Sequence, residues 1–152
     1  MILTLPVSHL INANNYHEVP SFKALEYKKE QPILDFSGTY FFHSGNGVID
    51  HDFIDYFDAL LPYLTTHNFS HFSFDIGPAS ENVRTEDYYY VAEGAVLSSE
   101  KIIQIASERI TYVKKRFNRV VALENLGNEP SSFIEVNLIE LIDNPYITIT
   151  NG

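Results

Sequence analysis

The chain has 152 residues, which are enough for one domain with a hydrophobic core, and we take this domain to cover residues 1–152. The formal net charge of −10 disfavours a nucleic-acid partner because acidic surfaces repel phosphate. Cysteine is absent, which excludes disulfides, thiolate metal sites and cysteine nucleophiles. No apolar run approaches the roughly 20 residues that cross a bilayer, and the first residues lack the basic segment of a signal peptide, so we expect a cytoplasmic protein with no membrane partner.

Short apolar or aromatic segments that end at turn residues predict the strands. In chain order, they cover residues 2–10, 21–28, 33–43, 69–76, 120–126 and 145–150. Between the third and the fourth strand, residues 50–67 show the apolar spacing of a helix. Asp50 is placed to cap the first turn of that helix, and Pro62 predicts a kink or a break within it.

The segment 79–97 has no clear period and is predicted to be a long loop. Residues 99–117 give the clearest helical pattern, with apolar residues on one face and basic residues in the last turns. Ser132 and Glu135 form a capping box for a third helix over residues 133–142.

Strands that alternate with helices predict an α/β fold with a mostly parallel sheet and right-handed crossovers. A closed eight-stranded barrel needs roughly 200 residues or more. The chain is therefore expected to form part of a TIM barrel, about half of one, or a small open α/β sheet.

Glu124 follows the apolar run 120–123 at the end of a predicted strand. A carboxylate in this position is costly to bury unless a cation, a metal or a substrate hydroxyl pairs with it. The carboxyl ends of strands are also where α/β barrels place their catalytic groups. Glu124 is therefore our candidate catalytic residue.

Four segments carry a family resemblance: A-L-E-Y at 24–27, F-F-H-S-G at 41–45, S-F-D-I at 73–76 and V-A-L-E-N at 121–125. In this order they resemble the N-terminal half of a xylose isomerase-like TIM barrel. More narrowly, they are similar to the multinuclear iron enzymes of methanobactin-type peptide modification, the MbnB/TglH-like family. That family has an L-E-V strand, a strand ending in a metal-binding His and Gly, S-E-H-L and L-L-L-E-N at the corresponding places.

The resemblance implies a divalent metal (Fe, Mn or Zn) with His43, Asp75 and Glu124 as ligands, although Asp75 stands where the family has a His. Glu26 and Asn125 are the candidate substrate-binding residues beside them. The family's remaining ligands come from the second half of the barrel. A second copy of the chain or a partner chain is therefore expected to complete it.

Each candidate also has a structural interpretation. His43 could be hydrogen-bonded to a loop, Glu124 could pair with a helix Lys or Arg, and Asp75 could close an Asx turn before residues 77–78. Glu26 could face the other side of its strand. Asn125 could orient Glu124 or cap the following turn.

Two functions remain open at this point. The first is a metal-dependent enzyme, or half of one, acting as an isomerase or epimerase on a sugar-like substrate or as an iron-dependent oxidase on a peptide. The second is a non-catalytic module, a partner-binding or degenerate barrel whose open sheet edge is covered by another chain.

Overall fold

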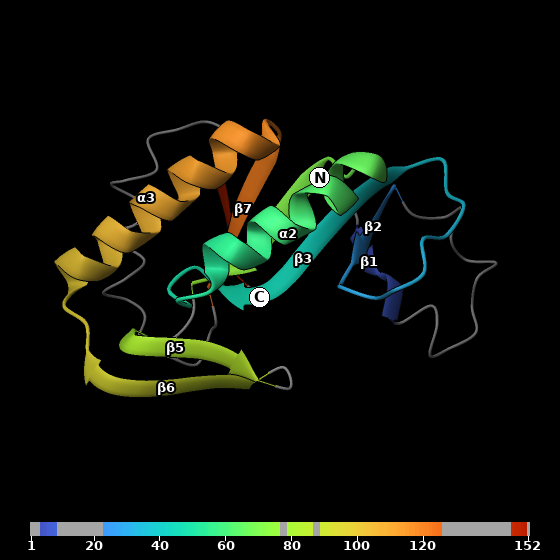
Figure 1. Ribbon diagram of the computed structural model, residues 1–152. Helices are drawn as coiled ribbons and strands as arrows, with labels where there is room; N and C mark the ends of the chain where they lie inside the picture. Colours follow the sequence, from blue (N-terminus) through green and yellow to red (C-terminus); the bar gives the residue numbers. More distant parts are fainter. Residues whose placement is uncertain (1–3, 9–22, 77–78, 87–88, 126–146, 152) are drawn as a thin grey trace.

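The computed structural model describes residues 4–8, 23–76, 79–86, 89–125 and 147–151 (Figure 1). Six strands form one sheet: β1 (Thr4–Pro6), β2 (Ala24–Tyr27), β3 (Thr39–Gly47), β4 (His71–Asp75), β7 (Val120–Asn125) and β8 (Ile147–Asn151). Two helices, α2 (Phe53–Thr66) and α3 (Ser99–Phe117), connect β3 to β4 and β4 to β7. A two-stranded hairpin of β5 (Ser80–Glu86) and β6 (Tyr89–Val96) precedes α3.

Every strand pair in the six-stranded sheet is parallel, which confirms the predicted α/β class. The strand order is β1-β2-β3-β4-β7-β8, so neighbours in the sheet follow one another along the chain. Such an order arises when each crossover moves one step in the same direction. The carboxyl ends of all six strands therefore meet at one edge of the sheet.

Both helices pack on the same face of this sheet, which we call the core face (Figure 1). Phe72 of β4 shows this directly, because its ring lies 5.5 Å from that of Phe57 on α2 and 6.1 Å from that of Phe117 on α3. Phe74, two residues further along β4, contacts Phe53 at the start of α2, with 4.9 Å between ring centroids. The alternation of the strand thus directs every second residue of β4 into the core.

The helix predicted over residues 99–117 is confirmed at both ends as α3. The Ser98 hydroxyl accepts a hydrogen bond from the backbone N–H of Lys101, which satisfies a donor that the helix start leaves free. Asn118 ends the helix in the left-handed conformation, with φ of 50°. The buried face consists of Ile102, Ala106, Ile110, Val113 and Phe117.

The other predicted helix, over residues 50–67, begins later than expected. Asp50 does not cap it; the Asp50 carboxylate accepts the backbone N–H of Asp52 at 3.1 Å in the turn before α2. Of the kink or break expected at Pro62, the break does not occur. This proline lies inside α2, and the buried residues Leu60 and Leu64 on either side of it stabilise the helix on the sheet.

The prediction of a long loop over residues 79–97 is wrong, because the structure forms the antiparallel hairpin β5–β6 there. A hairpin with mostly exposed side chains needs no apolar alternation, and Val83 is its one buried hydrophobic residue among those described. Backbone pairing and Gly94, which adopts a φ of 87°, define the hairpin instead. Such features leave little hydrophobic pattern in the sequence.

The other predicted strands are shifted or shortened. The strand predicted over 33–43 begins at Thr39 and extends to Gly47, because Leu34 and Phe36 pack on the core from a loop whose carbonyls accept the hydroxyl of Tyr40. Only Thr4–Pro6 of the strand predicted over 2–10 is seen as a strand in the described residues. The helix predicted over 133–142, with Ser132 and Glu135, lies outside the described residues.

Candidate metal centre

The opposite face of the sheet, which we call the polar face, carries the predicted site. Because Phe42 pairs with Phe72 in the core, the next residue pair, His43 and Ser73, falls on the polar face. By the same alternation, Asp75 of β4 also lies on this face, and so does its register partner Glu124 on the neighbouring strand β7. The sequence therefore brings polar side chains of β3, β4 and β7 together from segments that are separated by two crossovers.

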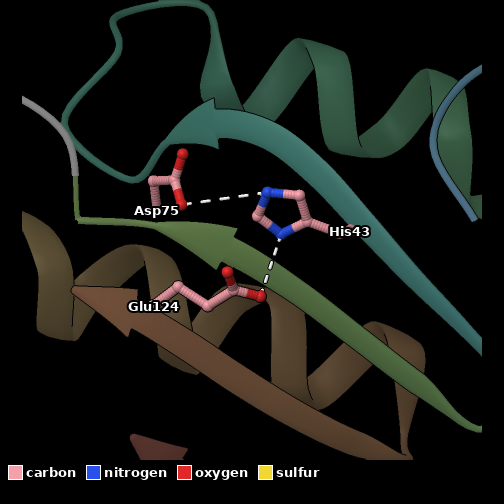
Figure 2. A group of neighbouring side chains, drawn as sticks. All are labelled: His43, Asp75 and Glu124. Carbon is pink, nitrogen blue, oxygen red and sulfur yellow. Dashed lines mark ion pairs between the residues drawn. The ribbon is translucent and has the colours of Figure 1, made fainter. Parts of the chain in front are cut away.

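Three of these side chains converge, as Figure 2 shows. The Nδ1 atom of His43 lies 3.0 Å from Oε1 of Glu124, and its Nε2 atom lies 3.9 Å from Oδ1 of Asp75. The His43 and Asp75 side chains are 9% and 8% exposed, and that of Glu124 is 24% exposed. One ligand atom from each residue lies within 4.8 Å of the other two, so the group could hold one metal ion.

Glu124 has its charge compensated by His43. No Lys or Arg of a described helix forms an ion pair with it, so the alternative of a helix salt bridge is wrong for the described part of the chain. Burial alone would raise the pKa of Glu124, but the hydrogen bond and charge of His43, with smaller effects of Ser73 and Lys28, lower it overall. The partly buried acid is thus held in its ionised form.

The pKa of His43 is shifted in the opposite direction. Burial would lower it, but the hydrogen bond to Glu124 and the charges of Glu124, Asp75 and Glu26 outweigh burial and raise it. The contribution of Glu26 fits its register, because it pairs with Phe41 and so shares the polar face with His43. The alternative in which Glu26 faces the core is therefore wrong.

Ser73 is the residue of this centre that sequence reasoning missed. Its hydroxyl lies 3.0 Å from Nδ1 of His43 and forms a hydrogen bond with the Glu124 carboxylate. The signal that could have found it is its position in β4, two residues before Asp75 and therefore on the same side of the strand. A serine in an aromatic strand carries no chemical signature by itself.

Two predictions fall on residues that are not fully described. The side chain of Asn125 lies outside the described residues, so its substrate-binding or orienting role stays a prediction. Residues 77–78 also lie outside them, and with them the Asx-turn alternative for Asp75. What the structure adds is that Asp75 is 6% exposed and that its backbone carbonyl accepts the N–H of Val48 at 2.7 Å, which joins the ends of β3 and β4.

A second group of ligand-type residues is formed by Asp50, His51 and Asp52 in the turn before α2. Both ring nitrogens of His51 already have protein partners: Nδ1 lies 2.8 Å from the carbonyl of Val83, and Nε2 lies 2.9 Å from the Asp52 carboxylate. The His51 and Asp52 side chains are 56% and 64% exposed. This group attaches the hairpin to the turn and is a weaker metal candidate than the buried centre.

A cavity of about 480 Å³ lies between this turn, the hairpin and α3, and none of the three residues of the buried centre lines it. Its wall includes Ile49, His51, Lys101, Ile105 and Arg109. Arg109 donates to the carbonyls of Val48 and Asp50 at 2.5 Å, and so fixes the turn against α3. The cavity and the buried centre are thus separate features.

Of the helices that the structure describes, neither has the length and apolar composition needed to span a membrane. A scan of protein-family models finds no match to the chain, and a search of curated proteins also returns none. The description of the site therefore rests on its own geometry.

Proposed function

We propose that the protein is a metal-dependent enzyme, or half of one, of the xylose isomerase-like barrel type. The observation that carries this proposal is the convergence of His43, Asp75 and Glu124, from three neighbouring parallel strands, within 4.8 Å. Asp75 is the last residue of β4, and its register partner Glu124 lies next to the end of β7. Parallel α/β proteins place their reactive groups at this edge.

The separation of His43 and Asp75 suits two ligands of one ion. Two ligand bonds of about 2.1 Å can join atoms that are at most about 4.2 Å apart. The Nε2–Oδ1 distance of 3.9 Å between His43 and Asp75 lies within this limit and is too long for a hydrogen bond. One imidazole and two carboxylates form a nitrogen and oxygen donor set that suits Fe, Mn or Zn.

A metal held there supplies Lewis-acid chemistry, or redox chemistry if it is iron. His43 and the carboxylates would hold and orient the ion, and the ionised Glu124 is the group best placed to take part in catalysis. Glu26, on the same face, and Asn125, at the end of β7, would contact the substrate. A sugar-like polyol or a peptide thiol are the substrate classes that the sequence resemblance suggests.

The barrel assignment is supported by the topology of the sheet. A doubly wound open sheet reverses its strand order and carries helices on both faces. Here the order β1-β2-β3-β4-β7-β8 shows no reversal, and both described helices lie on one face. We propose that the sheet is a barrel segment whose polar face is the barrel interior, with a second copy or a partner chain supplying the remaining strands.

Metal analysis tests the proposal. The purified chain is loaded separately with Fe²⁺, Mn²⁺ and Zn²⁺, dialysed and assayed for bound metal. We expect one of these ions at about one equivalent in the wild type and in His51→Ala, which alters the exposed group, and none in His43→Ala. If the wild type retains no metal, or if His43→Ala retains as much as the wild type, the proposal is wrong.

A second candidate function is favoured by one contact. The 3.0 Å separation of His43 and Glu124 is short enough for an ion pair that compensates the partly buried carboxylate without a metal. We propose as the alternative a degenerate barrel module that binds a partner chain. It predicts no bound metal and a mass in solution, by light scattering, above that of one chain; a metal-free monomer would contradict it.

A further inference from the structure

The two ring nitrogens of His43 face different surroundings. Nδ1 has two oxygen neighbours at 3.0 Å, Oγ of Ser73 and Oε1 of Glu124. Nε2 faces the Asp75 carboxylate, 3.9 Å away. Because the three partners come from β4 and β7, the neighbouring strands hold the imidazole by both of its edges (Figure 2).

The hydrogen bonds define where the proton of the neutral ring lies. An ionised carboxylate only accepts hydrogen bonds, so the Ser73 hydroxyl donates to Glu124. The hydroxyl proton is then committed, and the oxygen atoms of both Ser73 and Glu124 can only accept from Nδ1. This arrangement requires the proton on Nδ1 and leaves the lone pair on Nε2.

We infer that Ser73 and Glu124 are positioning residues that hold the Nδ1–H of His43 and so present Nε2, beside Asp75, as the nitrogen that binds the metal. The inference rests on the proposed function and narrows its donor set: of the three residues proposed there to hold the ion, His43 and Asp75 are the ligands, and Glu124 orients the His43 ring instead of binding the metal. Metal-binding histidines commonly donate their second nitrogen to a carboxylate in this way, and loss of such a partner typically weakens metal binding by about 10- to 100-fold.

The binding experiment uses Co²⁺ as the probe, with its visible absorption spectrum as a report on ligand geometry. Ser73→Val and Ser73→Thr have nearly the same shape and suit a strand, so the pair isolates the hydroxyl. We expect Ser73→Val to bind Co²⁺ at least about tenfold more weakly than the wild type, with an altered spectrum, and Ser73→Thr to restore both. Equal binding by Ser73→Val and the wild type would overturn the inference.

A matched control lies just before the start of the same strand. Ser70 also contacts a histidine, with 2.7 Å between its Oγ and Nδ1 of His71, but no residue of the buried centre. Ser70→Ala should bind Co²⁺ as the wild type does. A loss as large as that of Ser73→Val would mean that any serine change in this region disturbs the site, and the inference would fail.

The role of Glu124 is tested by comparing two amide variants. Glu124→Gln keeps an oxygen that accepts the Nδ1–H, whereas Asp75→Asn removes a charged ligand. We expect Asp75→Asn to lose at least about tenfold more Co²⁺ affinity than Glu124→Gln. Equal losses would make Glu124 a ligand and overturn the division of roles.

A measurement without metal separates the two proposals. In the protein labelled with ¹⁵N-histidine, at a pH where the ring is neutral, the His43 nitrogen shifts should report protonation at Nδ1 in the wild type and a mixture of tautomers when both acceptors are removed, in Ser73→Val with Glu124→Leu. An Nε2-protonated ring in the wild type would overturn the inference even if metal binds. Failure of the wild type to bind Co²⁺, Fe²⁺, Mn²⁺ or Zn²⁺ would overturn the proposed function, and the metal-binding part of this inference with it.

Discussion

The two faces of the six-stranded sheet carry different kinds of side chain. Along β4, Phe72 and Phe74 enter the core under α2 and α3, while Ser73 and Asp75 face the other way among His43 and Glu124. Residues next to each other in the sequence therefore have separate tasks. The strand alternation assigns stability to one face and the candidate chemistry to the other.

A second comparison lies within the polar face itself. His43 and His71 occupy this face on neighbouring strands, and each contacts a serine hydroxyl. Carboxylates surround His43 and raise its pKa despite burial, whereas burial lowers the pKa of His71, whose ring packs on Phe41 with 3.8 Å between centroids. The neighbouring charges, rather than burial, distinguish the candidate ligand from the structural histidine.

The largest effect is expected on the core face. Phe72→Ala removes a fully buried ring that contacts both helices, and should lower the free energy of unfolding by about 3–5 kcal/mol. Urea denaturation followed by circular dichroism measures the change. Phe41→Ala, on the polar face and partly exposed, is the matched control and should cost less. If the two variants lost equal amounts of unfolding free energy, the core face would not be the main source of stability.

The next effect is expected on the polar face. Asp75→Asn should weaken binding of the ion identified by metal analysis by about 100-fold, or roughly 2.7 kcal/mol, because it removes a charged ligand. The metal-free variant should lose less unfolding free energy than Phe72→Ala does. Isothermal titration calorimetry measures the metal affinity, and urea denaturation of the same samples measures the free energy of unfolding. If Asp75→Asn lost as much unfolding free energy as Phe72→Ala and yet bound metal normally, the assignment of metal binding to the polar face and of stability to the core face would be wrong.

The sequence predicted those parts of the fold that depend on a repeating hydrophobic pattern. The bounds of α3 could be predicted because its apolar period, the Ser98 cap and the basic last turn all agree. The hairpin β5–β6 could not, because backbone pairing specifies it while its side chains remain mostly exposed. Local propensity predicts a kink or a break at Pro62, and packing on the sheet keeps the helix unbroken there.

The candidate centre, too, could be predicted from the sequence only in part. Glu124 could be proposed from its place after an apolar strand segment, whereas His43 and Asp75 join it as ligands only through the family resemblance. The position of Ser73, two residues before Asp75, indicates the same side of the strand, but its contact with His43 depends on the register of β3 and β4. A one-residue slip of β4 would place Ser73 in the core and Phe74 in the centre.

The smallest expected effect concerns His71 and its dependence on pH. Burial lowers the pKa of His71 below the ordinary 6.5, so the folded protein binds a proton at this site less readily than the unfolded chain does. The stability that the neutral ring contributes is therefore fully present above pH 6.5 and is lost as the pH falls through the folded-state pKa. Urea denaturation at about pH 7.5 and about pH 5.5 should show the wild type losing stability relative to His71→Gln on acidification.

A direct NMR titration of the His71 ring connects this change to its cause. Phe41→Ala exposes the imidazole that the aromatic ring covers, so it should move the pKa of His71 back towards 6.5 and reduce the pH dependence. His43 should keep its raised pKa in that variant, because its carboxylate neighbours Glu124 and Asp75 are untouched. If Phe41→Ala shifted His43 as much as His71, burial rather than charge would control both histidines, and the contrast between the two ends of the polar face would disappear.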